Sequence, residues 1–167
     1  MADSNENLQA AFAGESQANR RYLAFAKKAD QEGLPHIARL FRAAAEAETV
    51  HAHAHLRAMG GVKDTKENLE TAVEGENYEF VTMYPGFLKK AEEEGNKPAE
   101  VSFRFALAVE RIHHELYTEA LQALKAGKDL PDRTVYVCPV CGNTVKGAPP
   151  DICPVCNVGG EKFEKVD

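Results

Sequence analysis

The sequence predicts a mainly α protein: a four-helix bundle followed by a small β/loop module that a metal holds together. Two observations carry this prediction. Over residues 3–131, alanine, glutamate, lysine and leucine are abundant and β-branched runs are absent, which favours helices. All 4 cysteines then lie in two Cys-x-x-Cys pairs, at 138–141 and 153–156, with the short segment 142–152 between the pairs. Such spacing lets four thiolates surround one metal ion.

Breaks at 33–35, 60–61 and 95–98 divide the helical region. Glycine suits the end of a helix, and proline suits the first turn of the next one. Pro85 falls inside the third helix, but apolar residues continue on both sides of it, so we expect a kinked and continuous helix there. The expected helices are, within roughly 2–4 residues, 4–32, 36–59, 65–94 and 98–126.

The composition changes at about Thr134. Val135-Tyr136-Val137 predicts a short strand, and Pro149-Pro150 and Gly159-Gly160 mark turns. We therefore expect two domains, a helical bundle over 1–130 and a metal module over 134–167. A module this short cannot bury a sufficient core, so metal binding must supply much of its folding free energy.

Charge and hydropathy restrict the class of protein. The net charge of −6 argues against a general nucleic-acid binder, which normally carries a basic stripe. No stretch approaches the roughly 18 apolar residues of a membrane span, and the chain opens on a polar, acidic segment rather than a signal peptide. We expect a cytoplasmic protein without a nucleic-acid or membrane partner, and cysteines in metal-like spacing suit that reducing compartment.

The helical region contains Glu-x-x-His twice, at Glu48 and His51 and again at Glu110 and His113. Residues three apart share one face of a helix. In both helices this face continues an apolar stripe, so we expect it to be buried; before Glu48 the stripe consists of Ile37, Leu40, Phe41 and Ala44. A glutamate on such a stripe is costly to bury unless a positive charge compensates it.

The two remaining helices each supply a matching glutamate. The interval from Glu15 to Glu48 is nearly equal to that from Glu76 to Glu110, which indicates two copies of one helical hairpin. Two glutamates plus two Glu-x-x-His motifs are the ligand set of carboxylate-bridged di-iron bundles. We assign Glu48 and Glu110 as bridging ligands. The terminal ligands are Glu15, Glu76, His51 and His113, and Glu79 is an extra carboxylate beyond the two-fold pattern.

The sequence of the four-cysteine module does not decide which metal it binds. Gly142 and Asn157 follow the two cysteine pairs, where a positive φ is often required and where both residue types tolerate it. A zinc ribbon uses the same ligands at the same spacing, and the module alone favours zinc. The neighbouring bundle favours iron, because a redox-active bundle needs a one-electron carrier.

These motifs together resemble the rubrerythrin family over nearly the whole length of the chain. The resemblance rests on Ala11-Phe12-Ala13-Gly14-Glu15-Ser16-Gln17, on Gly75-Glu76-Asn77-Tyr78-Glu79 followed by Met83-Tyr84-Pro85, on both Glu-x-x-His motifs and on the cysteine pairs. It implies a ferritin-like bundle with two non-haem irons and a rubredoxin-like domain with one iron. By resemblance, the di-iron ligands are Glu15, Glu48, Glu76, Glu79, Glu110 and His113, with His51 exchanging with Glu79 as one iron changes oxidation state, and the mononuclear iron ligands are Cys138, Cys141, Cys153 and Cys156.

The resemblance also implies an activity, the reduction of hydrogen peroxide to water in oxidative-stress defence. Electrons would reach the di-iron site through the four-cysteine iron, from rubredoxin or an NAD(P)H-dependent reductase, and a homodimer is expected. Asn157 replaces the glycine usual at its position, which affects the fine hydrogen bonding but not the ligands. Two other classes stay open: a ferroxidase or iron-storage protein with the same bundle, and a non-enzymatic metal or redox sensor whose tail is a zinc ribbon.

Overall fold

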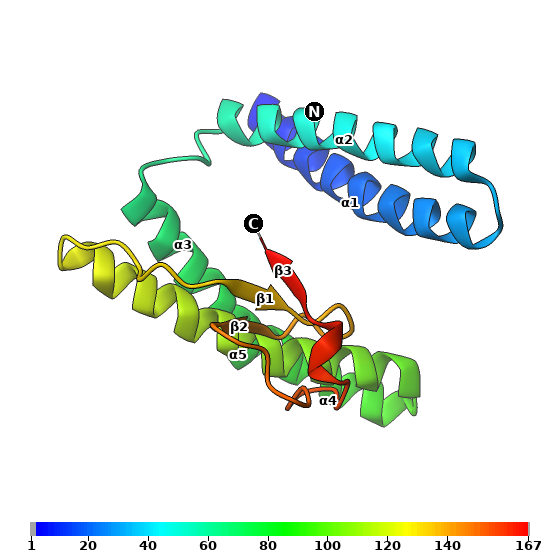
Figure 1. Ribbon diagram of the computed structural model, residues 1–167. Coiled ribbons are helices and arrows are strands. Elements are labelled where there is room, and N and C mark those ends of the chain that lie inside the picture. Colours follow the sequence, from blue (N-terminus) through cyan, green and yellow to red (C-terminus); the bar gives the residue numbers. More distant parts are fainter. Residues whose placement is uncertain (1–2, 167) are drawn as a thin grey trace. The chain divides into compact units, whose positions relative to one another are not determined.

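The computed structural model describes residues 3–166, which divide into two compact units with the boundary in the chain between Lys63 and Asp64. The first unit is a helical hairpin of α1 (Ser4–Gln31) and α2 (Pro35–Ala58) (Figure 1). Asp3 caps α1, since its carboxylate accepts hydrogen bonds from the backbone N–H groups of Asn5 and Glu6, both at 2.9 Å. Pro35 occupies the first turn of α2, where its missing N–H costs nothing.

The second unit contains a second helical hairpin and the C-terminal module. Its helices are α3 (Thr65–Tyr78), the π-helical segment η1 (Glu79–Met83), α4 (Tyr84–Glu94) and α5 (Lys97–Lys125). The module consists of β1 (Val135–Val137), β2 (Thr144–Lys146), the 3₁₀ turn η2 (Gly160–Lys162) and β3 (Glu164–Val166). Its three strands form an antiparallel sheet in the order β2-β1-β3.

Alanines form the seam between α1 and α2. The buried side chains of this hairpin are Ala26, Ala29, Ala38, Ala45 and Ala52. The expected buried stripe is partly wrong, because Ile37 is 48% exposed and Leu40 is 69% exposed, whereas Phe41 packs against the alanine cluster. A pair of helices has only one seam, and small side chains let the two backbones approach closely along it.

The two hairpins repeat each other in detail. Each contains a tyrosine and two phenylalanines in mutual ring contact, and in both the two phenylalanine centroids lie 5.6 Å apart. In each, an arginine of the second helix pairs with a carboxylate of the first. The aromatic triplets are Tyr22, Phe25 and Phe41 in the first hairpin and Tyr84, Phe87 and Phe103 in the second, and the interval along the chain is the same for all three counterparts.

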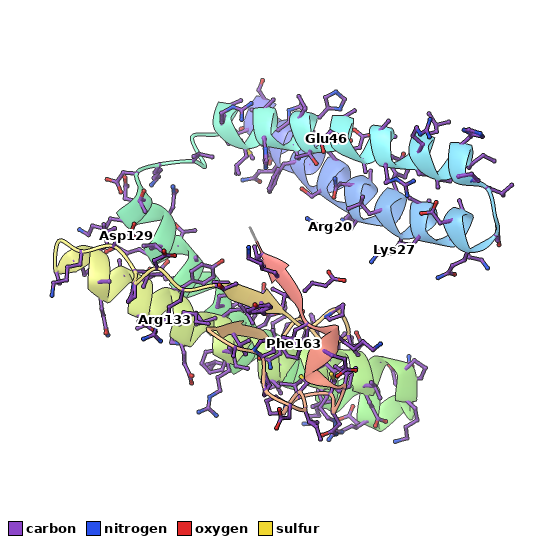
Figure 2. The ribbon with its side chains drawn as sticks, viewed as in Figure 1. Arg20, Lys27, Glu46, Asp129, Arg133 and Phe163 are labelled. Carbon is purple, nitrogen blue, oxygen red and sulfur yellow. The ribbon has the colours of Figure 1, made fainter. Side chains whose placement is uncertain are left out.

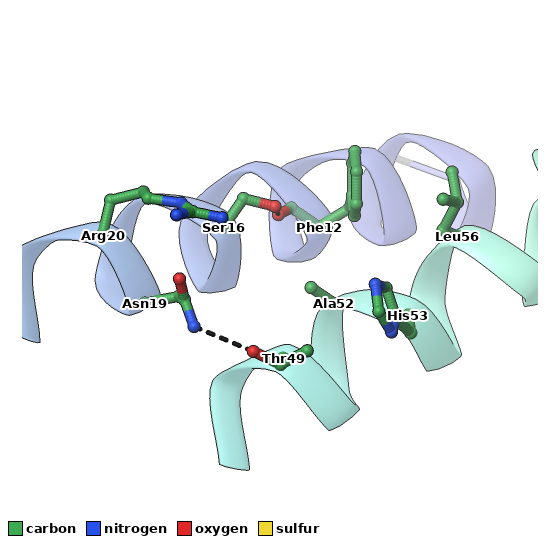
Figure 3. A pocket seen from close by; sticks show the side chains of 8 residues that line it. All are labelled: Phe12, Ser16, Asn19, Arg20, Thr49, Ala52, His53 and Leu56. Carbon is green, nitrogen blue, oxygen red and sulfur yellow. Dashed lines mark hydrogen bonds between the residues drawn. The ribbon is translucent and has the colours of Figure 1, made fainter. Parts of the chain in front are cut away.

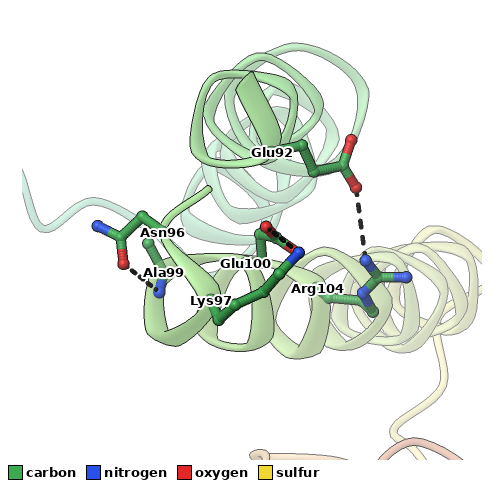
Figure 4. A network of polar contacts seen from close by, with 6 residues as sticks. All are labelled: Glu92, Asn96, Lys97, Ala99, Glu100 and Arg104. Atoms are coloured by element: carbon green, nitrogen blue, oxygen red, sulfur yellow. Dashed lines mark hydrogen bonds and ion pairs between the residues drawn. The ribbon is translucent and has the colours of Figure 1, made fainter. Parts of the chain in front are cut away.

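The arginine pairs follow the same interval. Arg42 lies 2.7 Å from Asp30, and its counterpart Arg104 lies 3.4 Å from Glu92 (Figure 4). Figure 4 also shows Lys97 beside Glu100, at 2.8 Å. Glu100 is the buried counterpart of Ala38, so the second seam holds a carboxylate where the first holds a methyl group.

The π-helical segment is where the repeat gains one residue. The interval from Glu15 to Glu76 is one position shorter than the interval from Tyr22 to Tyr84, so one residue has been inserted between Glu76 and Tyr84. A π turn accommodates one extra residue inside a helix. The helix over 65–94 is therefore continuous through Pro85, as expected, although the π turn itself was not predicted.

Four thiols and one aromatic ring form the centre of the module. Cys138, Cys153 and Phe163 are its buried core, and Phe163 lies between η2 and β3 (Figure 2). The strand expected at Val135-Tyr136-Val137 is confirmed as β1. The mainly α fold with a small C-terminal β module is likewise confirmed. Within the described residues, none of the helices has the length and hydropathy that crossing a bilayer requires.

Candidate metal centres

The first cluster of ligand-type side chains lies in the α1–α2 hairpin. One donor atom from each of Glu15, Glu48 and His51 falls within 4.8 Å of the others. His51 Nδ1 lies 3.0 Å from Glu48 Oε2, as the shared helix face predicts. The His51 side chain is 56% exposed in the described chain, whereas Glu48 is only 18% exposed.

The second cluster repeats the first in α3 and α5. Donor atoms of Glu76, Glu110 and His113 fall within 4.8 Å of one another. His113 Nδ1 lies 2.8 Å from Glu110 Oε2 and 4.0 Å from Glu76 Oε2. Glu79, the first residue of η1, is outside this group of close donor atoms but is near enough to interact electrostatically with Glu110 and His113.

The carboxylates of the second cluster lie close together, and the pKa of Glu76 and of two neighbouring groups is raised. Burial, reinforced by the neighbouring Glu110 carboxylate, raises the pKa of Glu76 from 4.5 to about 7. Burial and Glu110 also raise the pKa of Glu79. The pKa of the Tyr84 phenol is raised too, first by burial and then by the charges of nearby glutamates. A cation at this cluster would relieve the repulsion between these carboxylates.

The donor sets of both clusters therefore suit a metal. Carboxylate oxygens and imidazole nitrogens are ligands that iron accepts, and a Glu-x-x-His pair presents both from one helix face. Each cluster gathers partly buried carboxylates against one imidazole nitrogen, and burial of that much like charge is costly without a cation. Iron fits the residues present at both clusters.

The four cysteines form a compact thiol cluster. Cys138 Sγ lies 3.6 Å from Cys156 Sγ, and Cys141 Sγ lies 3.6 Å from Cys153 Sγ. All four are free cysteines. A tetrahedron of sulfurs bound to a metal at about 2.3 Å has edges of about 3.8 Å. The sulfurs are thus spaced for one tetrahedral metal and are much too far apart for disulfides.

Backbone geometry prepares the two cysteine loops for thiolates. Gly142 has φ 85° and Asn157 has φ 62°, so the left-handed conformation expected after each pair is present. Burial alone would oppose ionisation, yet the backbone N–H groups of Cys156 and Val155 lower the pKa of Cys153 from 9.0 to about 6. In contrast, burial raises the pKa of Cys141.

Asn143, the residue after Gly142, was missed by the sequence reasoning. Its side chain is only 1% exposed, and its amide Nδ2 donates to Cys153 Sγ at 3.7 Å. Its carbonyl accepts the N–H of Cys138 at 2.9 Å. The backbone of Asn143 therefore closes the first cysteine loop, while its side chain contacts a sulfur of the second. A buried amide directed at sulfur is a means of adjusting a metal's potential.

The module contacts α5 beside the second cluster. Thr144 Oγ1 lies 3.0 Å from His113 Nε2, and Lys146 forms an ion pair with Glu119. Thr144 and Lys146 are both on β2, where residues two apart share one face. No helical periodicity or cysteine spacing could have identified Thr144, because its partner lies far away along the chain, on α5.

A separate hollow of about 220 Å³ lies on the first hairpin. Asn19 donates across it to Thr49 Oγ1 at 2.8 Å (Figure 3). Arg20 and His53 also border it. None of the three residues of the first metal cluster lines this hollow, although Ser16, Thr49 and Ala52 follow them directly in the chain.

Comparison with known proteins agrees with these centres. The Rubrerythrin family model matches residues 6–121, and the model "Rubrerythrin, rubredoxin-like domain" matches residues 136–164. Rubrerythrin-2 of Clostridium acetobutylicum is 36% identical, over 94% of this chain and 93% of its own. Nigerythrin of Nitratidesulfovibrio vulgaris is 38% identical, over 90% and 80%. A structure of nigerythrin in a partially reduced state superposes with a TM-score of 0.59 at 34% identity, covering 99% of this chain and 88% of that one.

Proposed function

The chain belongs to the rubrerythrin family, and from this premise we propose that it is a non-haem di-iron peroxidase that reduces hydrogen peroxide to water. As a member of the family it is an oxidoreductase with a di-iron site and a rubredoxin-like four-cysteine site.

The proposed ligands follow the sequence assignment. The two irons would be held by Glu15, Glu48, Glu76, Glu79, Glu110 and His113, and His51 would exchange with Glu79. The exposure of the two histidines supports different roles, since the His51 side chain is 56% exposed and that of His113 is 27% exposed. A ring that must exchange with a carboxylate needs room to move.

When bound, the two irons supply the electrons that cleave the peroxide O–O bond, and the reaction consumes two electrons and two protons for two waters. Glu76 is itself a proposed ligand, and a bound cation would favour its ionised form over the raised pKa that it has without one. The chain also provides an acidic group beside that chemistry. The raised pKa of Tyr84 keeps its phenolic proton in place, so its O–H remains a hydrogen-bond donor.

The four-cysteine site is the proposed electron input. Its four thiolates, Cys138, Cys141, Cys153 and Cys156, would hold one iron that accepts electrons singly, which zinc cannot do. The external donor would be rubredoxin or an NAD(P)H-dependent reductase, and the active form a homodimer. The thiolates also need a reducing compartment, which supports the expected cytoplasmic location.

One observation carries the proposal: the chain combines two matching carboxylate–histidine clusters with a sulfur tetrahedron. A ferroxidase or iron store would share the clusters but has no use for a fused redox module. A sensor with a zinc ribbon would use the tail but leaves both clusters unexplained. The domain limits 1–130 and 134–167 remain our prediction for how these functions divide.

The test is anaerobic reduction followed by stoichiometric hydrogen peroxide, with the visible absorbance recorded and iron and zinc quantified on the same sample. Iron in both centres, a thiolate–iron band that bleaches on reduction and rapid reoxidation by peroxide are expected. Glu48→Gln should abolish fast reoxidation. Glu46→Gln, on an exposed side chain of the same helix (Figure 2), should not.

Two results would contradict the proposal. Zinc in the thiolate site with no fast reoxidation would indicate a structural tail. If Cys153→Ser kept NAD(P)H-linked peroxide reduction intact, the four-cysteine iron would not be the electron input.

A further inference from the structure

The contact between β2 and α5 places a hydroxyl against one imidazole of the second cluster. Thr144 Oγ1 lies 3.0 Å from His113 Nε2, and both side chains are partly buried. The opposite ring nitrogen, His113 Nδ1, lies 2.8 Å from Glu110 Oε2. The imidazole is therefore held from both sides, by the module at Nε2 and by a carboxylate at Nδ1.

The direction of the hydrogen bonds follows from the proton count. The Thr144 hydroxyl donates its single proton to the Gly142 carbonyl at 3.0 Å. Its oxygen is then left to accept from His113, so Nε2 carries a hydrogen. Nδ1 is the nitrogen that faces Glu110 and Glu76. A carboxylate only accepts, so the 2.8 Å contact with Glu110 has a proton between the two atoms while no metal is bound, and a metal at Nδ1 would take the place of that proton.

We infer that Thr144 is a positioning residue for His113, which fixes the ring and its tautomer so that Nδ1 is presented to a metal. The inference deepens the proposed function and rests on its assignment of His113 as a ligand. A ligating histidine commonly donates its other N–H to a partner that orients the ring. Here the partner is supplied by the four-cysteine module, close after Cys141 in the chain.

Neighbouring residues of the module face both centres. Asn143 directs its amide to Cys153 Sγ at 3.7 Å, while Thr144 directs its hydroxyl to His113. Successive residues at a strand point to opposite sides, so the start of β2 presents one side chain to each centre. The folding of the cysteine module is thereby linked to the orientation of a histidine on α5.

The repeat provides an internal contrast. His51 is the counterpart of His113 in the first hairpin, at the same interval as the aromatic triplets, but that hairpin carries no cysteine module. Its side chain is twice as exposed, at 56% against 27%. The contact with Thr144 thus fixes the ring of His113, whereas the equivalent ring of His51 has no such partner within its own hairpin among the described residues.

A purely mechanical reading of the contact is that Thr144 only docks the module on α5. The ion pair between Lys146 and Glu119 allows the two readings to be separated. It joins the same two elements through the same face of β2, and the Glu119 side chain is 54% exposed. Glu119→Gln therefore weakens docking without removing the hydroxyl.

The experiment compares Thr144→Val, which is similar in shape but lacks the hydroxyl, with Thr144→Ser, which keeps it, and with Glu119→Gln. With the four-cysteine site filled, affinity for Zn²⁺ at the carboxylate–histidine clusters is measured by competition with a chromophoric chelator. The protonated ring nitrogen of His113 is identified by ¹⁵N NMR, with and without that zinc. The thiolate–iron absorption band of iron-loaded samples verifies that each variant keeps a folded module.

Thr144→Val should lower the zinc affinity of the cluster that contains His113 by about tenfold. The slowly exchanging Nε2–H signal of His113 should disappear or exchange faster. Thr144→Ser and Glu119→Gln should stay within about twofold of the unmodified protein and keep the signal. An unchanged affinity in Thr144→Val, or an equal loss in Glu119→Gln, would overturn the inference. If the zinc results are as expected but the iron-loaded protein does not turn over peroxide, only the proposed peroxidase activity is rejected. If zinc does not bind to His113, both the ligand assignment and the inference are rejected.

Discussion

Glu76 should destabilise the folded protein at neutral pH while no cation is bound at the second carboxylate cluster. Its pKa rises from 4.5 to about 7 on folding, because it is buried and lies near Glu110. Between these pH values the folded chain retains a proton that the unfolded chain releases. Stability contributed by this group is therefore fully present below pH 4.5 and is lost as the pH rises to about 7.

The magnitude follows from the difference between the two pKa values. At about 1.36 kcal/mol per pH unit, a rise from 4.5 to about 7 corresponds to about 3 kcal/mol. The Glu76 side chain is only 20% exposed, so water screens little of this effect. Glu76→Gln removes the titration. The variant should match the unmodified protein near pH 4.5 and be more stable by up to about 3 kcal/mol near pH 8.

Denaturant unfolding, followed by far-UV circular dichroism across this pH range, measures the difference. Zinc fills the four-cysteine site in every sample, and a weak chelator keeps the carboxylate clusters free of metal. Glu74→Gln is the control, because Glu74 is exposed on the same helix and should change nothing. Curves for Glu76→Gln and the unmodified protein that run parallel from pH 4.5 to 8 would refute the reasoning. So would a relative gain of stability by the unmodified protein as the pH rises.

Three further outcomes are expected. Asn143→Leu removes the amide donor to Cys153 Sγ, so the potential of the thiolate iron, measured by spectroelectrochemistry, should fall by roughly 40 mV, the equivalent of about 1 kcal/mol for one electron. Deleting Val81 from η1 should restore a regular α-helix and turn Glu79 away from its present position, which reduced iron stoichiometry at an unchanged helical content would reveal. Gly95→Ala places a Cβ at φ 67° and should lower the free energy of unfolding by about 1 kcal/mol; an unchanged midpoint would contradict the left-handed turn.

The sequence was sufficient for the helices, the strand β1 and the grouping of each Glu-x-x-His pair, because these depend on contacts between residues close in the chain. Glu48 and His51 must share a face wherever their helix forms. The sequence could not decide which apolar stripe becomes the seam, and alanines such as Ala38 occupy it instead of Leu40. Helical periodicity marks apolar faces but does not choose between two of them.

The contacts that sequence reasoning missed depend on long-range packing. Thr144 meets His113 only because β2 lies on α5. Asn143 could have been suspected from its place beside a cysteine pair, but only burial shows that its side chain points inward. The sequence does contain a sign of the π turn, because the repeat interval lengthens by one position after Glu76. This change can be recognised once the two hairpins are aligned residue by residue.

That single inserted residue has a consequence for symmetry. Two identical hairpins related by a two-fold axis would have to offer both metals the same ligands, so neither metal could differ from the other. Joining the hairpins in one chain removes this constraint, and the insertion at η1 uses the freedom, since Glu79 has no glutamate counterpart among Gln17 and Ala18. Under the proposed ligand assignment the two metal positions of this duplicated structure would differ, because one would change its ligand while the other would keep its own.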